Sequence, residues 1–281
     1  MIQVAGMDFQ PSDMWQTNGI ESLIIRLMQE NPIVYSYPSK DEFLFEIKLR
    51  KNIIVSAKSM NQGDSPFALL AESRCNPKYW ILTNAGGFQL RDGVKPSDAI
   101  RDIYQNSSLY AFECATAILI IYYHAVLNSI NENAFNQLFR NLHLYSWHAD
   151  PDLGIHNMIT NYILPGDVVY FNNPDYNPET PWWRGENAVV LGNDTYFGHG
   201  VGIESAEHMI EFLNKTRRPG SNLSAYLKNF VTRPSFNHLA KYSMLPWAYI
   251  TPKILHPIIF HNQSSISYDQ YLYYLNKVYN P

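Results

Sequence analysis

The chain has 281 residues, of which 46% are hydrophobic and only 16% are charged, and its formal net charge is −4. It is long enough for one large domain or two small ones, and its acidic balance argues against a nucleic-acid partner. Its two cysteines, Cys75 and Cys114, exclude a disulfide framework and favour a reducing compartment. We expect no membrane partner, because the first residues do not resemble a secretory signal and the apolar run over 115–126 is too short to span a bilayer.

The first half of the chain is predicted to be mainly helical. Apolar residues at helical spacing begin at Ile20 and stop before Pro32, and a short strand is expected over 33–37. Ser39 and Glu42 form a capping box that opens a long helix towards Met60. Further elements follow in chain order: a hairpin over 79–84 and 88–91, a short helix from Pro96, an apolar helix from Cys114 to about Asn128, and a helix over 132–140.

The second half is predicted to carry most of the strands. One strand is expected over 167–171, and a hairpin joins 187–191 to 195–199 through Gly192-Asn193-Asp194. Ser205 is expected to cap a helix that runs to about Thr216. From about Ser221 onward the pattern is less regular. We therefore predict one α+β domain over 1–233, and a C-terminal extension over 234–281 that packs on the surface and has no assigned role.

Cys114 is the strongest candidate for a reactive group. It lies at the start of the apolar helix, where free N–H groups and the helix dipole favour an anion, so we expect a lowered thiol pKa and a nucleophilic thiolate. The alternative is that Cys114 is a small buried apolar side chain. Cys75 lies in a loop with no following helix and is a poorer candidate.

A thiol catalyst needs a base or an imidazolium nearby. His199 lies between two glycines at a strand end, and the hairpin places Glu186 almost opposite it. The alternative for His199 is a structural role at the strand end, and the alternative for Glu186 is a salt bridge to Arg184. Glu113 is a second carboxylate that opposes thiolate formation or shuttles a proton. A cysteine at a helix N-terminus facing a histidine and a carboxylate on an antiparallel sheet is the arrangement of papain-like thiol enzymes, and a compact core of that kind is the predicted fold.

The sequence predicts neither a metal site nor a cofactor. The cluster of His148, Asp150, Asp152 and His156 fits no standard ligand spacing and is interpreted as a solvated loop. An Asp-rich EF-hand loop, a P-loop and a G-x-G-x-x-G motif are all absent from the sequence.

Two long segments carry a resemblance to a known family. They are A-I-R-D-I-Y-Q-N-S-S-L-Y-A-F-E-C-A-T-A-I-L-I-I-Y-Y at 99–123 and W-R-G-E-N-A-V-V-L-G-N-D-T-Y-F-G-H-G-V-G-I at 183–203. They closely resemble the transglutaminases of endospore-forming bacteria, the protein-glutamine γ-glutamyltransferases associated with the spore coat. The resemblance implies a papain-like fold and calcium-independent cross-linking of coat proteins through ε-(γ-glutamyl)lysine bonds, with a final location on the spore coat after synthesis in the mother cell.

By motif, the resemblance places the nucleophile at Cys114, its acidic partner at Glu186, the imidazole at His199 and a second carboxylate at Glu113. It also implies a substrate tunnel with mainly aromatic walls. The tunnel is lined by Phe67, Trp147, Trp183 and Asn187. Trp147 or Asn187 is a candidate donor to the oxyanion, together with the backbone N–H of Cys114. The division of base duty between His199 and the two glutamates stays open. The alternatives are a papain-like cysteine peptidase or amidase, and a non-catalytic coat protein.

Overall fold

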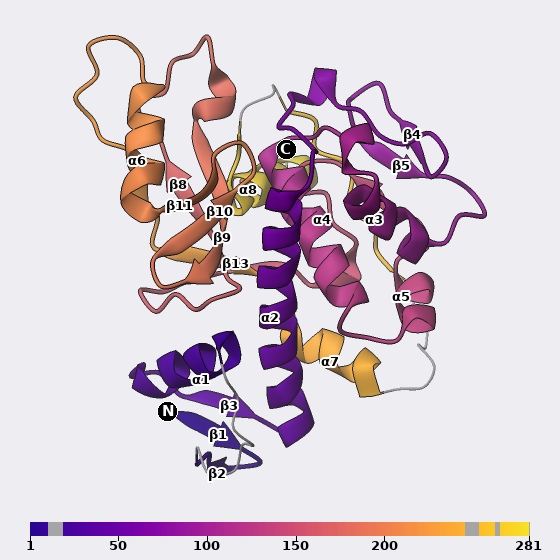
Figure 1. Ribbon diagram of the computed structural model, residues 1–281, viewed down its shortest axis with the longest axis vertical. Coiled ribbons are helices and arrows are strands. Elements are labelled where there is room, and N and C mark those ends of the chain that lie inside the picture. The colour runs from indigo at the N-terminus through magenta and orange to yellow at the C-terminus, as the bar shows by residue number, and fades with distance from the viewer. Residues whose placement is uncertain (11–18, 245–252, 262–264, 281) are drawn as a thin grey trace.

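The long helix α2 (Lys40–Gln62) runs through the middle of the molecule, and the other elements are arranged around it (Figure 1). The computed structural model describes residues 1–281 except 11–18, 245–252, 262–264 and 281. Ser39 caps α2 by accepting a hydrogen bond from the backbone N–H of Glu42 at 3.2 Å, as its capping box predicts. The N-terminal strands and α1 lie at one end of α2, the large sheet lies along one side, and α3 to α5 lie along the other (Figure 1).

The predicted helices of the first 220 residues are all present. Their bounds are α1 (Ile20–Glu30), α3 (Pro96–Gln105), α4 (Cys114–Leu127), α5 (Glu132–Leu138) and α6 (Ala206–Lys215). Two further helices, α7 (Phe236–Met244) and α8 (Tyr268–Tyr279), lie in the stretch predicted to be irregular. That prediction was wrong because the aromatic residues of this stretch supply apolar helix faces that obscure the simple 3.6-residue pattern.

The strands among the described residues form three sheets. An N-terminal sheet has the order β2-β1-β3, from β1 (Ile2–Val4), β2 (Met7–Asp8) and β3 (Tyr35–Tyr37). A second sheet has the order β4-β5-β6, from β4 (Trp80–Leu82), β5 (Phe88–Leu90) and β6 (His143–Leu144), and its β4–β5 hairpin was predicted.

The third sheet is the largest and antiparallel, with the order β11-β10-β9-β8-β13-β7, and β12 pairs with β8. Its strands have the following bounds: β7 (His156–Ile159), β8 (Val168–Asn172), β9 (Gly185–Gly192), β10 (Thr195–Gly198), β11 (Gly202–Ser205), β12 (Tyr226–Leu227) and β13 (Phe230–Arg233). The predicted β9–β10 hairpin is present, but a bulge at Thr195/Tyr196 sets its register. The ladder ends with Gly198 opposite Ala188, so His199 lies beyond the paired strand and is not directly opposite Glu186.

Helix α4 is the centre of the core. Thirteen residues of this helix, from Cys114 to Leu127, are buried, and only His124 among its fourteen residues is not. A helix that is apolar on every face is stable only when it is surrounded, and here α2, α3, α5 and the sheet strand β9 surround it. The C-terminal stretch joins the same core through the following side chains: Leu239, Tyr242, Ile266, Tyr268, Tyr271 and Leu275. The extension therefore does not simply cover the surface.

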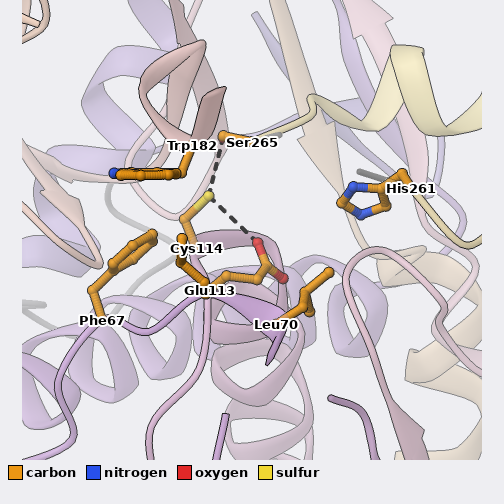
Figure 2. Close-up of a pocket in the computed structure, with 8 residues that line it drawn as sticks. Phe67, Leu70, Glu113, Cys114, Trp182, His261 and Ser265 are labelled. Atoms are coloured by element: carbon orange, nitrogen blue, oxygen red, sulfur yellow. Dashed lines mark hydrogen bonds between the residues drawn. The ribbon is translucent and has the colours of Figure 1, made fainter. Parts of the chain in front are cut away.

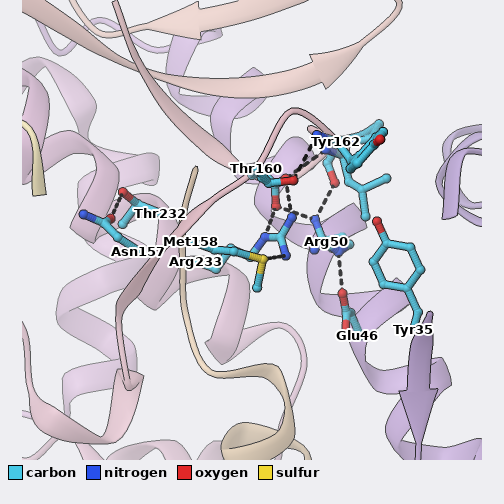
Figure 3. Close-up of polar contacts among 12 residues, drawn as sticks. Tyr35, Glu46, Arg50, Asn157, Met158, Thr160, Tyr162, Thr232 and Arg233 are labelled. Atoms are coloured by element: carbon cyan, nitrogen blue, oxygen red, sulfur yellow. Dashed lines mark hydrogen bonds and ion pairs between the residues drawn. The ribbon is translucent and has the colours of Figure 1, made fainter. Parts of the chain in front are cut away.

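A buried ion cluster fastens α2 to the large sheet (Figure 3). Arg50 is fully buried and donates to Glu46 at 2.8 Å and to Asp167 at 2.7 Å. Arg233, on β13, donates to both oxygens of the same aspartate, at 2.6 and 2.8 Å. Burial alone would raise the pKa of Asp167, but Arg233 and Arg50 lower it below its usual range. The two positive and two negative charges balance, and this pairing reduces the free-energy cost of burying them.

Nothing in the described part of the chain qualifies as a bilayer-spanning helix. Helix α2 has 23 residues but carries charges along its length, and the apolar helix α4 has only 14.

Candidate active site

The thiol of Cys114 lies at the first residue of α4 and is 1% exposed. It opens onto a narrow pocket whose free volume is about 10 Å³, which is room for about one water molecule. The pocket has the following lining: Phe67, Leu69, Leu70, Glu113, Cys114, Trp182, His261 and Ser265. Figure 2 shows Phe67 and Trp182 on one side of the thiol and His261 and Leu70 on the other.

Glu113 is the N-cap of α4, and its carboxylate takes up the free N–H groups of the helix start. It accepts from the backbone N–H of Ala115 at 2.7 Å and of Thr116 at 2.6 Å, and from the Thr116 hydroxyl at 2.7 Å. Three donors therefore converge on the two oxygens of the Glu113 side chain. The thiol of Cys114 in turn donates to Oε2 of Glu113 over 3.6 Å (Figure 2). Glu113 is therefore the carboxylate in direct reach of the thiol proton.

The expected lowering of the Cys114 pKa was wrong for this arrangement. Burial raises the pKa of the thiol well above its usual range, and the negative charges of Glu186 and Glu113 raise it further. Hydrogen bonds from Ser265 and Asn187 oppose this rise only in part. The physical reason is that Glu113 already occupies the anion site at the helix N-terminus, so the helix start stabilises a carboxylate in place of a thiolate.

Glu186 is the second residue of β9 and is 1% exposed. Burial raises its pKa to about 8, the charge of Glu113 adds to the rise, and the backbone N–H of His199 opposes it. Neither oxygen of its carboxyl group has a hydrogen bond of normal geometry to any described residue. A carboxyl group in this state carries a proton at neutral pH and can deliver it to a leaving group.

His199 is buried directly after β10, and its ring stacks on Phe112 with a centroid distance of 4.6 Å. Burial lowers its pKa to about 4, so the ring is neutral at pH 7. Its Nε2 has no hydrogen-bond partner within the described ranges. The expected pairing with Glu186 is not formed, since that carboxyl group lies against the backbone of Gly198 and His199 and does not bond to the imidazole.

The four predicted tunnel residues do not all lie at the pocket. Phe67 lines the pocket, and Trp183 stacks behind it with ring centroids 5.6 Å apart. Asn187 lies on β9, and its Nδ2 is 3.5 Å from the Cys114 sulfur. Trp147 is fully buried and donates from Nε1 to the carbonyl of Ile266 at 2.9 Å. Of this set, only Phe67 reaches the pocket lining.

Several lining residues were not predicted. Trp182 belongs to an aromatic pair near the site in the sequence, but only its neighbour Trp183 was assigned to the tunnel. Leu69 and Leu70 are apolar residues, and no motif in the sequence marks them as pocket-lining. His261 and Ser265 come from the C-terminal extension and reach the thiol from about 150 residues away in the chain. No short-range pattern reports such a contact.

The fold and the site together define a papain-like thiol enzyme: a cysteine at the start of a buried helix, packed against an antiparallel sheet that carries a carboxyl group and an imidazole. The family profile described as protein-glutamine gamma-glutamyltransferase matches residues 1–243. The chain belongs to this family, whose members are acyltransferases.

Individual relatives agree with this assignment. A protein-glutamine gamma-glutamyltransferase of Halalkalibacterium halodurans is 49% identical over 275 residues, which cover 98% of this chain and 97% of that relative. One from Bacillus mycoides is 46% identical over 220 residues, covering 78% of this chain and 80% of the relative. A solved structure, the transglutaminase from Geobacillus stearothermophilus without its C-terminal extension, superposes with a TM-score of 0.71 at 48% identity, covering 74% of this chain and all of that one.

Proposed function

We propose that this enzyme cross-links spore coat proteins through a Cys114 thioester and needs no calcium. The observation that carries the chemistry is the position of the sulfur, 3.6 Å from a carboxylate that can take its proton and 3.5 Å from an amide donor. A second carboxyl group, that of Glu186, lies close enough to the thiol for its charge, in the ionised form, to raise the pKa of Cys114, and burial raises the pKa of Glu186 itself to about 8. The coat assignment is supported by the resemblance to the enzymes of endospore-forming bacteria.

In the first half-reaction the thiol proton passes from Cys114 to Glu113, and the sulfur attacks the γ-carboxamide carbon of a protein glutamine. The oxygen of the tetrahedral intermediate becomes negative. The indole N–H of Trp147 and the side-chain amide of Asn187 both donate to the carbonyl oxygen of Ile266, at 2.9 and 3.0 Å. The two donors therefore point at a single oxygen position. This is the geometry of an oxyanion hole. Glu186 then gives its proton to the leaving nitrogen, the C–N bond breaks, ammonia departs, and a thioester remains.

In the second half-reaction a neutral lysine amine attacks the thioester carbon. Glu186, now a carboxylate, takes the proton of the amine, and His199 is the alternative base because its Nε2 is unpartnered among the described residues. The tetrahedral intermediate collapses, the C–S bond breaks, and the sulfur recovers its proton from Glu113. The product is an ε-(γ-glutamyl)lysine bond. Aromatic walls formed by Phe67 and Trp182 exclude water and favour transfer over hydrolysis.

The test uses a glutamine-containing acceptor protein, a fluorescent primary amine and a chelator of divalent cations. We expect amine incorporation by the wild type with and without chelator, and none by Cys114→Ala, whereas Cys75→Ala should keep full activity. Ammonia release or peptide fragments without incorporation would assign a hydrolase instead. Cross-linked coat extracts from cells that carry the wild-type gene or Cys114→Ala test the substrate assignment.

The base assignment is tested by pH profiles of kcat/KM for Glu186→Gln and His199→Gln. If Glu186 is the proton donor, Glu186→Gln loses at least about a hundredfold in rate, and His199→Gln retains the shape of the wild-type profile. The reverse pattern would assign the proton transfer to His199.

A further inference from the structure

Residues of the C-terminal extension occupy the site in which the proposed chemistry takes place. Ser265 places its hydroxyl oxygen 3.2 Å from the Cys114 sulfur (Figure 2). Ser265 is 3% exposed and the next residue, Ile266, is 1% exposed. This segment is therefore enclosed by the active site.

The enzyme holds this segment by its main chain. The carbonyl oxygen of Ile266 accepts from Trp147 Nε1 at 2.9 Å and from Asn187 Nδ2 at 3.0 Å. The carbonyl oxygen of Ser265 accepts from the hydroxyl of Tyr170 at 3.2 Å. Contacts to main-chain oxygens do not depend on side-chain identity, so the same three donors can hold another extended peptide.

These donors need a partner when the segment is absent. Each of them is buried, and a buried donor that has no acceptor destabilises the folded chain. A glutamine-bearing peptide supplies the acceptors: its carboxamide oxygen takes the place of the Ile266 oxygen, and a main-chain carbonyl takes that of Ser265. The segment presents a main-chain carbonyl at this position and has no side-chain carboxamide at Ser265 or Ile266, so it lacks the γ-glutamyl group that the proposed reaction transfers.

Both flanks of the segment are anchored. On one side His261 pairs with the hydroxyl of Ser146 at 2.9 Å. On the other side Ser267 caps α8, and the ring of Tyr268 packs edge-on against Trp147 with centroids 5.2 Å apart. Leu275, further along α8, is buried in the main core.

We propose that Trp147, Asn187 and Tyr170 form the acyl-donor site for glutamine-bearing peptides, and that Ser265 and Ile266 occupy it as an intramolecular pseudosubstrate. The proposal rests on the proposed transglutaminase chemistry for the identity of the ligand. Glutamine substrate binds only when α8 and the attached segment leave. The apparent KM for the glutamine protein therefore equals its intrinsic value divided by the fraction of chains that are open.

The experiment loosens α8 in the full chain. Leu275→Asp places a charge in the core under α8, and Val278→Asp makes the same change at an exposed position of the same helix. Two quantities are measured: the rate of Cys114 alkylation by iodoacetamide, with Cys75 in the same chain as reference, and the KM for dimethylcasein in amine incorporation.

We expect Leu275→Asp to raise the alkylation rate of Cys114 at least about tenfold and to lower the KM for casein by a similar factor, with the KM for the amine unchanged. Val278→Asp should match the wild type. If hydrogen exchange shows α8 released in Leu275→Asp while alkylation and KM stay at wild-type values, the pseudosubstrate is refuted. If alkylation rises but no variant incorporates amine, the segment covers the thiol as inferred and the proposed function fails.

A second variant covers the case in which Leu275→Asp does not fold. Ser265→Cys places a second sulfur beside Cys114, and mild oxidation should join the two positions in a disulfide within the chain. We expect reversible loss of incorporation, restored by reductant, while Ser243→Cys on α7 forms no such bond. Failure of the Ser265→Cys protein to cross-link would show that the segment lies outside the site in solution.

Discussion

Glu186→Gln should make the free energy of unfolding less sensitive to pH. In the folded chain burial raises the pKa of Glu186 to about 8, from its ordinary value of 4.5. Between these two values the unfolded chain loses the proton while the folded chain keeps it, so the folded state binds more protons and stability falls as pH rises. At about 1.4 kcal/mol per pKa unit, the wild type loses on the order of 4 kcal/mol between about pH 5 and pH 9 through this one group.

Glutamine has nearly the same shape and does not ionise, so the variant lacks this loss. The assay is urea unfolding followed by tryptophan fluorescence across that pH range, with the stability difference between variant and wild type plotted against pH. The difference should increase steadily up to about pH 8 and then level off. Glu211→Gln, at an exposed position of α6, serves as the matched control and should give a flat line. A flat line for Glu186→Gln as well would mean that Glu186 is ionised in the folded chain and cannot supply the proton for ammonia.

Three further changes follow from the structure. Arg50→Met leaves the buried charge of Asp167 short of one partner and should cost about 3–5 kcal/mol in chemical denaturation; a cost below about 1 kcal/mol would contradict the role of this cluster. Gly198→Ala places a Cβ 2.8 Å from the Cγ of Glu186, so kcat should fall by at least about tenfold while stability changes by about 1–3 kcal/mol, as measured by kinetics and melting. Ser39→Ala removes the cap of α2 and should cost about 1 kcal/mol with activity unchanged; a loss of activity at constant stability would speak against a purely structural cap.

The elements around the site were predictable because each is specified by local patterns. The capping box at Ser39 placed α2, the apolar run placed α4, and the Gly192-Asn193-Asp194 turn placed the β9–β10 hairpin. The pairing of that hairpin is centred on Asn193, as predicted, and only the bulge at Thr195/Tyr196 was missed, because it carries no distinct residue signal. The short strands β1, β2, β6, β7, β11, β12 and β13 were missed because two to four residues show no usable alternation.

The electrostatics of the site depend on contacts between distant segments, and these could not be predicted. The helix start at Cys114 correctly indicated an anion site, but the neighbouring Glu113 fills it. Enclosure of the thiol by Ser265 depends on a contact 151 residues away along the chain. The sequence therefore indicated the anion site at the start of α4, whereas its prediction of a lowered pKa for Cys114 was wrong.

The high pKa of the enclosed thiol has a consequence for oxidative damage. Peroxides and disulfides react with thiolates, and the neutral thiol is nearly inert to them. Burial also raises the pKa of Cys75, to about 11, so neither cysteine of the closed chain is ionised at neutral pH. Under the proposed mechanism, a closed chain can be stored under oxidising conditions with its nucleophile intact, and Cys114 becomes vulnerable to oxidants only when the C-terminal segment leaves the site.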